Sequence, residues 1–334
     1  MKSDETDTLD AAQRWLDAGR GVALGTVINT WGSAPRQAGS AIAVRDDGAF
    51  VGSVSGGCVE GAVIEQAQAA MRDGKFRRLE FGVQDEQAWS VGLACGGRIE
   101  ILVEPIVSDR ARNSLRVLNE ARHLERTMVR AIDVSTGEDR LVDPSLDNSP
   151  LGLAAATAAR ADRSMNVEIE GRPWFLALAN PAVDLVIIGA VHVAQALTKM
   201  AALVGFRVRV IDPRTSFATN ERFPGVTLSH EYPDEALARA PLGRRSALVT
   251  LSHDPKIDDP ALSVALDSPA FYIGALGSKK TQAARHDRLK ARGFSDGQLG
   301  RIHGPVGLAI GAKSPEEIAL SIVAQITEVL RKAA

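Results

Sequence analysis

The pattern of hydrophobic and polar positions changes in the middle of the chain, near Asp184. Before it, short stretches alternate between apolar and polar residues, which is typical of half-buried strands in antiparallel sheets. Strands or hairpins are predicted at residues 22–29, 40–54, 76–82, 98–105, 127–141 and 167–180, and helices at residues 9–18, 59–71 and 108–123. The first half is therefore expected to be a mixed domain of α+β or α/β type.

From Asp184 onward the strands are continuously apolar, as expected for a parallel sheet that helices cover on both faces. They are predicted at residues 185–188, 207–211, 247–251 and 271–273. Helical patterns alternate with these strands, which predicts a Rossmann-like, doubly wound parallel sheet. The last helix opens with the capping box Ser314-Pro315-Glu316-Glu317. With a boundary at Asn180-Pro181, two domains are expected, residues 1–182 and 183–334.

Composition agrees with two globular domains and argues against several classes of function. The chain has 334 residues, a formal net charge of -2 and 45% hydrophobic residues, which fits two domains of about 100–200 residues each. The balanced charge argues against a nucleic-acid partner. No apolar run reaches the roughly 18 residues of a membrane span, and the acidic N-terminus lacks the apolar core of a secretory signal. A cytoplasmic protein with reduced thiols is expected.

The chain has two cysteines, and each lies beside a Gly-Gly pair. Cys58 belongs to the stretch Gly-Ser-Val-Ser-Gly-Gly-Cys-Val-Glu-Gly at residues 52–61, which joins a predicted strand to a predicted helix. Glycines there permit positive φ and close approach of a ligand, and the N-terminal end of a helix favours a thiolate. Cys95 precedes Gly96 and Gly97, just before the strand that begins at Arg98.

Other interpretations of the two cysteines remain open. Both could be small core residues, or they could form a disulfide, which a reducing cytoplasm disfavours. A metal site is not indicated, because the chain has no Cys-x-x-Cys motif and no clustered histidine partners. Cys58 and Cys95 are therefore candidate reactive thiols, with no catalytic residue or metal ligand assigned.

A dinucleotide site is the first possibility for the second half. Gly189 follows a strand and opens a helix, and Asp212 ends the next strand, which is the context of a Rossmann fingerprint. Val191, however, stands where the second glycine lets the pyrophosphate approach. This residue weakens the prediction of NAD(P) binding. The alternative is a sheet kept as a scaffold, with Asp212 pairing with Arg214.

Several other polar residues are expected at the carboxyl edge of this sheet, where ligands of such folds bind. They suit an anionic, phosphate-bearing ligand, and they are His192, His253, Asp254, Gly277, Ser278 and Lys279. Taken singly, each could equally be a solvated or capping residue. The carboxylates of Asp254, Asp258 and Asp259 could hold a divalent cation, although a solvated loop is the favoured interpretation.

These stretches together resemble the xanthine dehydrogenase accessory protein family, of the XdhC and CoxI type. The resemblance covers nearly the whole chain, and the matching stretches are residues 32–36, 52–61, 93–97, 185–196, 212–214, 252–254, 272–279 and 304–317. The chain departs from the family pattern at Val191, where glycine is usual.

The resemblance implies an accessory chaperone rather than an enzyme with turnover of its own. Such a protein binds molybdenum cofactor, a molybdopterin, keeps it while a cysteine desulfurase supplies the terminal sulfur, and inserts it into an apo molybdenum hydroxylase of the xanthine or carbon monoxide dehydrogenase type. A homodimer is plausible for such a chaperone. Two alternatives remain, an NAD(P)-dependent oxidoreductase that uses the second domain and a thiol sulfur-carrier protein.

The residues expected to face the cofactor in the first domain follow from the resemblance and the motif together. Cys58 and Cys95 could be soft ligands on the molybdenum side or hold sulfur during transfer, and Arg36 could pair with the phosphate. The remaining candidates are Ser55, Gly56, Gly57, Glu60, Gly96 and Gly97.

Overall fold

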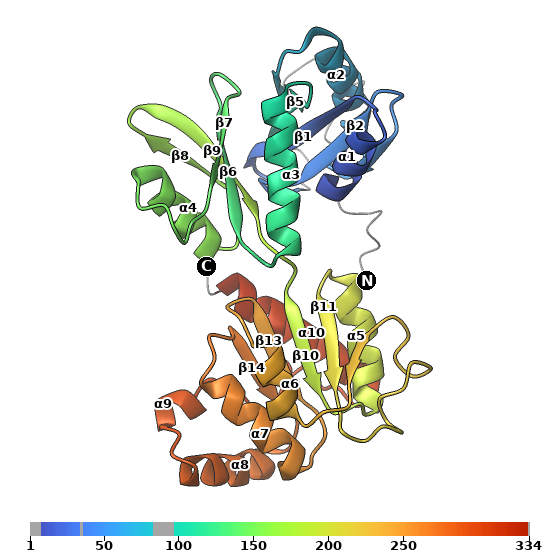
Figure 1. Cartoon of the computed structure of the whole chain (residues 1–334), viewed down its shortest axis with the longest axis vertical. Helices are drawn as coiled ribbons and strands as arrows, with labels where there is room; N and C mark the ends of the chain where they lie inside the picture. The colour runs from blue at the N-terminus through green and yellow to red at the C-terminus, as the bar shows by residue number, and fades with distance from the viewer. Residues whose placement is uncertain (1–7, 34–35, 83–96, 333–334) are drawn as a thin grey trace. The chain divides into compact units, whose positions relative to one another are not determined.

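The computed structural model describes residues 8–33, 36–82 and 97–332. They form two compact units that divide between Pro181 and Ala182 (Figure 1). The first unit carries two antiparallel sheets and the second a parallel sheet. The expected fold class is therefore confirmed.

The larger sheet of the first unit has five strands in the order β3-β2-β1-β5-β4. These strands are β1 (Val22–Trp31), β2 (Ala41–Arg45), β3 (Phe50–Gly52), β4 (Arg77–Phe81) and β5 (Arg98–Pro105). All pairs are antiparallel. The strands at the centre, β1 and β5, are almost wholly buried, because helices cover both faces of the sheet.

Helix α2 (Glu60–Asp73) packs on one face of this sheet, and α1 (Thr8–Asp17) and α3 (Asp109–His123) pack on the other. On the α2 face, Val59, Val63 and Ala67 meet Ile99 and Ile101 of β5. This packing sets where α2 begins, and it fixes the position of the loop that leads into it from β3.

A second sheet of the first unit has four strands in the order β7-β6-β9-β8. Its strands are β6 (Met128–Asp133), β7 (Asp139–Val142), β8 (Met165–Ile169) and β9 (Arg172–Ala179). Apolar side chains join it to the larger sheet, namely Ile28, Leu102, Ile132, Val134 and Phe175. The buried guanidinium of Arg130 also bridges the sheets, because it donates to Glu104 of β5 and to Asp139 of β7.

Helix α4 (Pro150–Arg160) covers the outer face of the four-stranded sheet. The sequence pattern predicted the polar loop before it but not the helix itself. Ser149 caps this helix by accepting a hydrogen bond from the N–H of Gly152, and Pro150 occupies its first turn. Most residues of this helix are alanine or other apolar types, so its sequence shows no alternation of polar and apolar faces. The periodicity of the sequence therefore did not predict it.

The second unit contains a six-stranded parallel sheet in the order β12-β11-β10-β13-β14-β15. The four inner strands match the prediction and are β10 (Asp184–Ile188), β11 (Arg207–Ile211), β13 (Ser246–Thr250) and β14 (Tyr272–Ala275). The edge strands β12 (Thr227–Ser229) and β15 (Ile302–His303) were not predicted, because each is too short to show a pattern.

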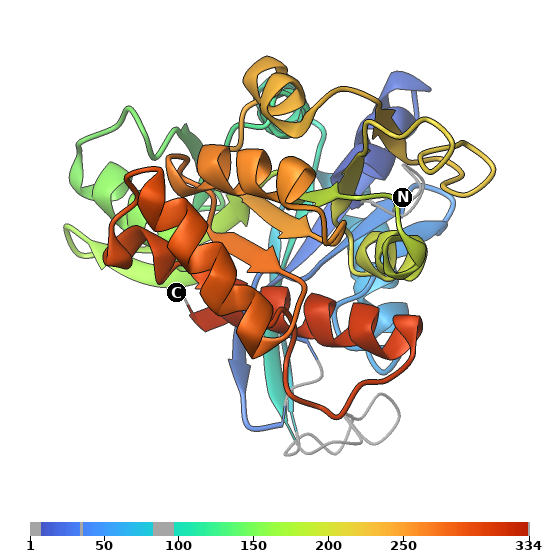
Figure 2. The ribbon, with the colours of Figure 1, turned by 90° about the horizontal axis from the view of Figure 1, so that it is seen from below.

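Helices cover both faces of the parallel sheet, as Figure 2 shows from the end of this unit. Helices α5 (His192–Leu203) and α10 (Pro315–Lys332) pack on one face, and α6 (Pro233–Arg239), α7 (Pro255–Leu266), α8 (Lys279–Ala291) and α9 (Asp296–Leu299) pack on the other. The capping box predicted for the last helix is confirmed, since Ser314 accepts from the N–H of Glu317 and the Glu317 carboxylate accepts from the N–H of Ser314.

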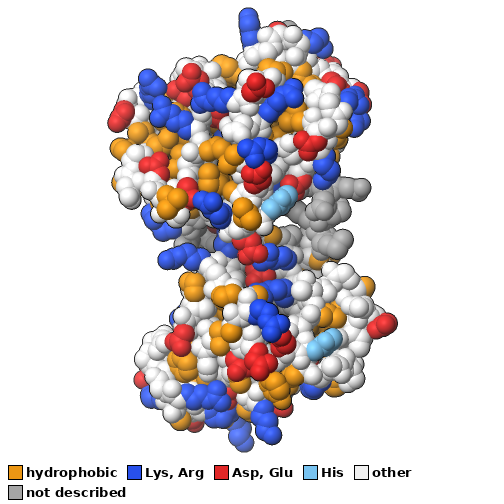
Figure 3. Space-filling view, in the orientation of Figure 1, with side chains coloured by type: hydrophobic (Ala, Val, Ile, Leu, Met, Phe, Trp, Pro, Cys, Tyr) orange, Lys and Arg blue, Asp and Glu red, His pale blue; other side chains and the backbone are white. Residues whose placement is uncertain are grey.

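The surface carries acidic and basic side chains interspersed with each other on the face seen in Figure 3. Among the helices of the described residues, none has the length and apolar character needed to cross a bilayer.

Candidate functional site

The loop between β3 and α2 carries Cys58, and we refer to residues 53–59 as the Cys58 loop. Two glycines give this loop its shape, because Gly56 and Gly57 have φ values of +80° and +120°. Gly52, just before the loop, is required for a second reason. A Cβ atom at that position would lie 2.3 Å from the carbonyl oxygen of Ala41. The glycines singled out in the sequence therefore define the backbone of this turn.

The carboxylate of Glu60 lies inside the Cys58 loop and organises it. Glu60 is the first residue of α2 and is 7% exposed. Its two oxygens accept six hydrogen bonds from the loop, and the donors are the hydroxyls of Ser53 and Ser55 and the N–H groups of Val54, Ser55, Gly56 and Gly57. The Glu60 carboxylate thus makes a hydrogen bond to every residue from 53 to 57.

This arrangement limits how the Cys58 loop could bind a ligand. Gly56 and Gly57 were expected to face the cofactor, but the N–H groups of both donate to Glu60. The N–H groups of Cys58 and Val59 donate to the hydroxyl of Ser55, each at 3.0 Å. Ser55 and Glu60, which were expected to bind the cofactor, are thus buried and engaged within the protein.

The charge of Glu60 is maintained by its donors. Burial alone would raise the pKa of Glu60, but hydrogen bonds from the hydroxyls of Ser55 and Ser53 and from the Ser55 backbone outweigh it and lower the pKa to about 2. The carboxylate is therefore ionised at neutral pH. The loop contains its own anion, and this occupies the concave side of its backbone N–H groups.

Cys58 itself is a free, half-buried cysteine. It packs against the apolar cluster between α2 and the sheet, in which Val59 and Ile99 lie. Among the described residues, a Cβ atom built on Gly56, Gly57 or Gly61, close to Cys58 in the chain, would meet nothing within 4 Å. The thiol thus stands at the boundary between the core and an open region at the start of α2.

The structure says less about the other predicted residues of the first domain. Gly97 is buried at the entrance to β5, whereas Cys95 and Gly96 lie outside the described residues. Arg36 is exposed in the segment between β1 and β2. The prediction that Cys58, Cys95 and Arg36 share a ligand stays a prediction.

In the second domain, the turn after β10 has the backbone expected of a Rossmann sheet. The acid that follows the next strand, Asp212, forms hydrogen bonds within the protein. Gly189 has a φ of +100° and lies against Ser252, so the turns after β10 and β13 are in contact. Asp212 is fully buried. Its carboxylate accepts from the N–H of Ala190 at 2.7 Å and from the guanidinium of Arg214 at 2.7 and 2.8 Å.

These contacts favour the scaffold interpretation of the second domain over an NAD(P) site. A ribose would need the acid that ends the second strand, and Asp212 is instead committed to Ala190 and Arg214. Burial would raise the pKa of Asp212, but the bonds from Arg214 and Ala190 outweigh it and lower the pKa. Val191 takes the N-cap position of α5 with an extended backbone, and His192 beside it is exposed.

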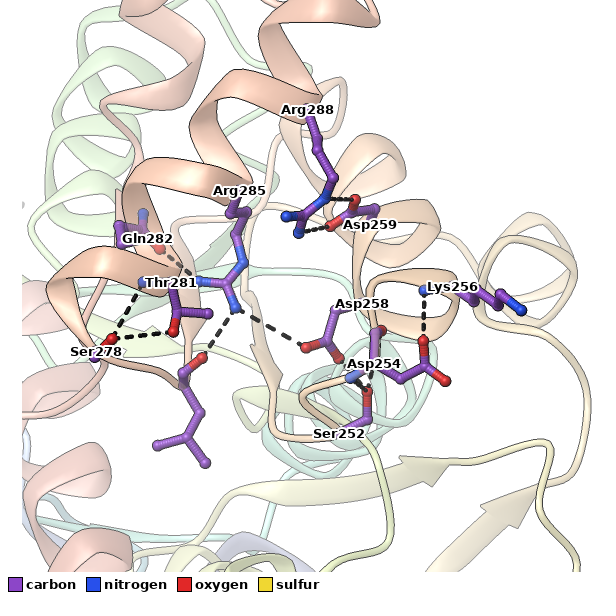
Figure 4. A network of polar contacts seen from close by, with 11 residues as sticks. Ser252, Asp254, Lys256, Asp258, Asp259, Ser278, Thr281, Gln282, Arg285 and Arg288 are labelled. Carbon is purple, nitrogen blue, oxygen red and sulfur yellow. Dashed lines mark hydrogen bonds and ion pairs between the residues drawn. The ribbon is translucent and has the colours of Figure 1, made fainter.

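The turn after β13 leads into a network of polar contacts that Figure 4 shows from close by. Asp254 caps α7 by accepting from the N–H of Lys256, and the hydroxyl of Ser252 donates to Asp258 at 2.6 Å. His253 is exposed and has a φ of +62°. The capping alternative is therefore the one that the structure shows for Asp254.

The three carboxylates considered as ligands of a divalent cation each contact different partners. Asp258 faces Ser252 and the buried Arg285, and Asp259 accepts from Arg288 at 2.6 and 3.0 Å (Figure 4). Within residues 8–33, 36–82 and 97–332, no group of three His, Cys, Asp or Glu side chains is placed to hold a metal ion.

The turn after β14 ends at the N-terminus of α8. Ser278 caps this helix by accepting from the N–H of Thr281, and Lys279 is exposed at its first position. Gly277 has a φ of +142°. Behind this turn lies Arg285, 2% exposed, which donates to the carbonyl of Leu276 and lies 4.0 Å from Asp258. No sequence signal indicated this buried pair, because its members lie on different helices.

The fold and the loop define a two-domain protein in which a Rossmann domain follows an α+β domain that carries a cysteine loop. Residues 185–326 match the family model described as the XdhC Rossmann domain, and residues 15–82 match that of the XdhC and CoxI family. The chain therefore belongs to the XdhC and CoxI family, and the resemblance seen in its sequence is confirmed.

Relatives of known name resemble the chain over nearly its full length. It is 29% identical over 329 residues to the molybdenum cofactor insertion chaperone PaoD of Escherichia coli, covering 98% of this chain and 90% of that protein. It is 26% identical over 324 residues to a Bacillus subtilis protein named as a probable subunit of xanthine dehydrogenase, covering 93% of this chain and 94% of that protein.

A solved structure shares the fold. The crystal structure of a Bacillus halodurans protein described as a xanthine dehydrogenase superposes with a TM-score of 0.77 and 24% identity, covering 98% of this chain and 96% of that one. At this identity the likeness establishes the fold alone.

Proposed function

We propose that this protein is a chaperone that binds molybdenum cofactor and inserts it into an apo molybdenum hydroxylase. The observation that carries the proposal is the similarity to the insertion chaperone PaoD, which extends over both domains and 98% of the chain. The second relative, whose name refers to xanthine dehydrogenase, points to the same class of client enzyme. The protein acts in the cytoplasm, where thiols stay reduced.

The Cys58 loop is the part of the first domain best suited to the cargo. Its thiol is free and half-buried, and thiolates are soft ligands of the kind that a molybdenum centre accepts. The open space over Gly56, Gly57 and Gly61 gives a bulky ligand access to it. Because Glu60 occupies the N–H groups of the loop, the phosphate of the cargo is bound by other groups, for which the exposed Arg36 is a candidate.

The proposal includes the step before insertion. The chaperone holds the cofactor while a cysteine desulfurase installs the terminal sulfur ligand, and then delivers it as a dimer to its client. The protein has no turnover of its own, so its activity is measured by retention and transfer of the cargo.

The test is to load the wild-type protein and two variants with molybdenum cofactor and to measure the molybdenum and pterin that each retains after gel filtration. Cys58→Ala is expected to lose the cargo, and Lys279→Ala, at the exposed start of α8, is expected to retain it. Loss in Lys279→Ala alone would place the cargo at the Rossmann domain instead. If the wild-type protein retains no pterin, the chaperone proposal fails.

A further inference from the structure

Glu60 accepts more hydrogen bonds than its place in the first turn of a helix explains. An acid in the first turn of a helix is usually explained by its favourable interaction with the helix dipole while it remains in water. Glu60 instead turns back over the preceding segment, is 7% exposed, and accepts all six of the hydrogen bonds described above from residues 53–57. Its partners belong to the Cys58 loop and not to the helix.

The contacts continue from Glu60 to the backbone of Cys58. The hydroxyl of Ser55 donates to one oxygen of Glu60, and its oxygen accepts from the N–H groups of Cys58 and Val59. Ser55 is 2% exposed, so this relay is closed to water. The carboxylate thereby determines where the backbone of Cys58 lies at the start of α2, and it acts through the backbone rather than through the sulfur.

The positions of Glu60 and of the glycines separate two roles, binding the cargo and holding the loop in place, which the sequence did not distinguish. A group that binds cargo must reach the open side of the loop, where Gly56, Gly57 and Gly61 leave space. Glu60 lies on the opposite, buried side and has its oxygens occupied. Charged hydrogen bonds of this kind are about twice as strong as neutral ones, so removing the charge should loosen the whole loop.

We propose that Glu60 is a positioning residue for Cys58, which fixes the Cys58 loop through Ser55 and does not itself bind the cargo. This inference rests on the proposed function, because it assigns Glu60 a part in presenting the thiol to molybdenum cofactor. It also makes a statement about the free protein: the accessibility of the Cys58 thiol depends on the Glu60 carboxylate.

The experiment compares Glu60→Gln with Glu65→Gln, an exposed glutamate on the same helix. Glutamine at residue 60 keeps the size, but its NH₂ group cannot accept the hydrogen bond from the N–H of Gly57. Alkylation of the full-length protein by iodoacetamide is followed by peptide mass spectrometry, so that Cys58 is measured separately from Cys95. We expect Cys58 to react about tenfold faster in Glu60→Gln, the effect of losing one charged hydrogen bond, and at the wild-type rate in Glu65→Gln.

Cargo retention gives the second readout. Glu60→Gln is expected to retain less molybdenum and pterin than wild type, and Glu65→Gln the same amount. Unchanged alkylation of Cys58 in Glu60→Gln would overturn the inference, whatever the cargo does. A changed alkylation rate with no cargo bound to any variant, wild type included, would keep the positioning role and reject the chaperone function.

A further variant covers the case in which Glu60→Gln does not fold. Ser55→Ala leaves the four bonds from backbone N–H groups to Glu60 in place and removes only the bonds of the Ser55 hydroxyl, which donates to Glu60 and accepts from the N–H groups of Cys58 and Val59. It should also speed alkylation of Cys58, while circular dichroism shows an intact fold. Wild-type alkylation in a folded Ser55→Ala protein would show that Glu60 does not act on Cys58 through Ser55.

Discussion

The carboxylate of Asp212 accepts a hydrogen bond of 2.7 Å from the N–H of Ala190. Asp212, which follows β11, therefore stabilises the turn that joins β10 to α5. In dinucleotide-binding sheets an acid at this place binds a ribose of the ligand, but here Arg214 occupies the rest of the carboxylate. The fold keeps the Rossmann topology and uses its characteristic acid to stabilise itself.

We expect Asp212→Asn to lower the free energy of unfolding by about 1–3 kcal/mol. The amide nitrogen of asparagine cannot accept from Arg214 or Ala190, so a buried donor loses its partner. Urea denaturation measures the effect, and Asp287→Asn, at an exposed position of α8, should change stability by less than about 0.5 kcal/mol. Equal stability of Asp212→Asn and wild type would show that the hydrogen bonds of Asp212 do not stabilise the fold.

The stability that Glu60 provides should depend on pH. Its pKa is lowered to about 2 in the folded protein, below the ordinary value of about 4.3. The contribution is therefore fully present above about pH 4.5 and is lost as the pH falls toward 2. We expect the difference in unfolding free energy between wild type and Glu60→Gln to be about 2 kcal/mol at pH 6 and to shrink through this window. A difference that stays constant from pH 6 to pH 2.5 would show that the charge of Glu60 contributes nothing to folding.

The sequence predicted the strands and the Cys58 turn because their signals are local. Continuous apolar runs identified β10, β11, β13 and β14, and glycines with positive φ marked the turn at Gly56 and Gly57. Helix α4 was missed although Ser149-Pro150 offered a capping signal at its start.

The direction in which polar side chains point could not be predicted from the sequence. Nothing in the stretch Cys58-Val59-Glu60 shows that the carboxylate turns inward, because this depends on the path of the four residues that donate their N–H groups to it. Asp258 and Arg285 come together only when α7 and α8 pack on the same face of the sheet. Such contacts require the tertiary structure.

The buried pair of Asp258 and Arg285 gives a second pH prediction, of opposite sign. Burial raises the pKa of Asp258 above its ordinary value, against the effects of Ser252 and Arg285. The ionised carboxylate is thus disfavoured in the folded protein, and stability from this group is present below about pH 3.9 and is lost as the pH rises through the folded pKa. Arg285→Met removes the compensating charge and should raise that pKa further.

We therefore expect Arg285→Met to destabilise the protein by about 3 kcal/mol at pH 7 and by clearly less at pH 4. Thermal unfolding at both pH values measures this, with Asp258→Asn/Arg285→Met as the matched control. The double variant has no carboxylate to ionise at residue 258, so its cost should not depend on pH in this range. If the single variant costs the same at both pH values, Asp258 is not the group whose charge Arg285 compensates.

Gly61 offers a way to separate the stability of the fold from access to the proposed cargo site. It is the second residue of α2, is exposed, and lacks a positive φ. A Cβ atom there would meet nothing within 4 Å in the part of the chain that the structure describes, so neither the backbone conformation nor the described packing requires glycine. Alanine should stabilise the helix by about 0.5 kcal/mol.

If cargo approaches Cys58 across this open space, Gly61→Ala should lower the retention of molybdenum and pterin while leaving the melting temperature equal to or above that of wild type. Gly297→Ala is the matched control, because Gly297 is also the exposed second residue of a helix, α9, in the other domain. It should leave retention unchanged. A variant whose melting temperature is not lowered does not lose cargo through unfolding, so such a loss would indicate that the methyl group occupies space that the cargo uses. Full retention by Gly61→Ala would show that the cargo does not approach over the first turn of α2.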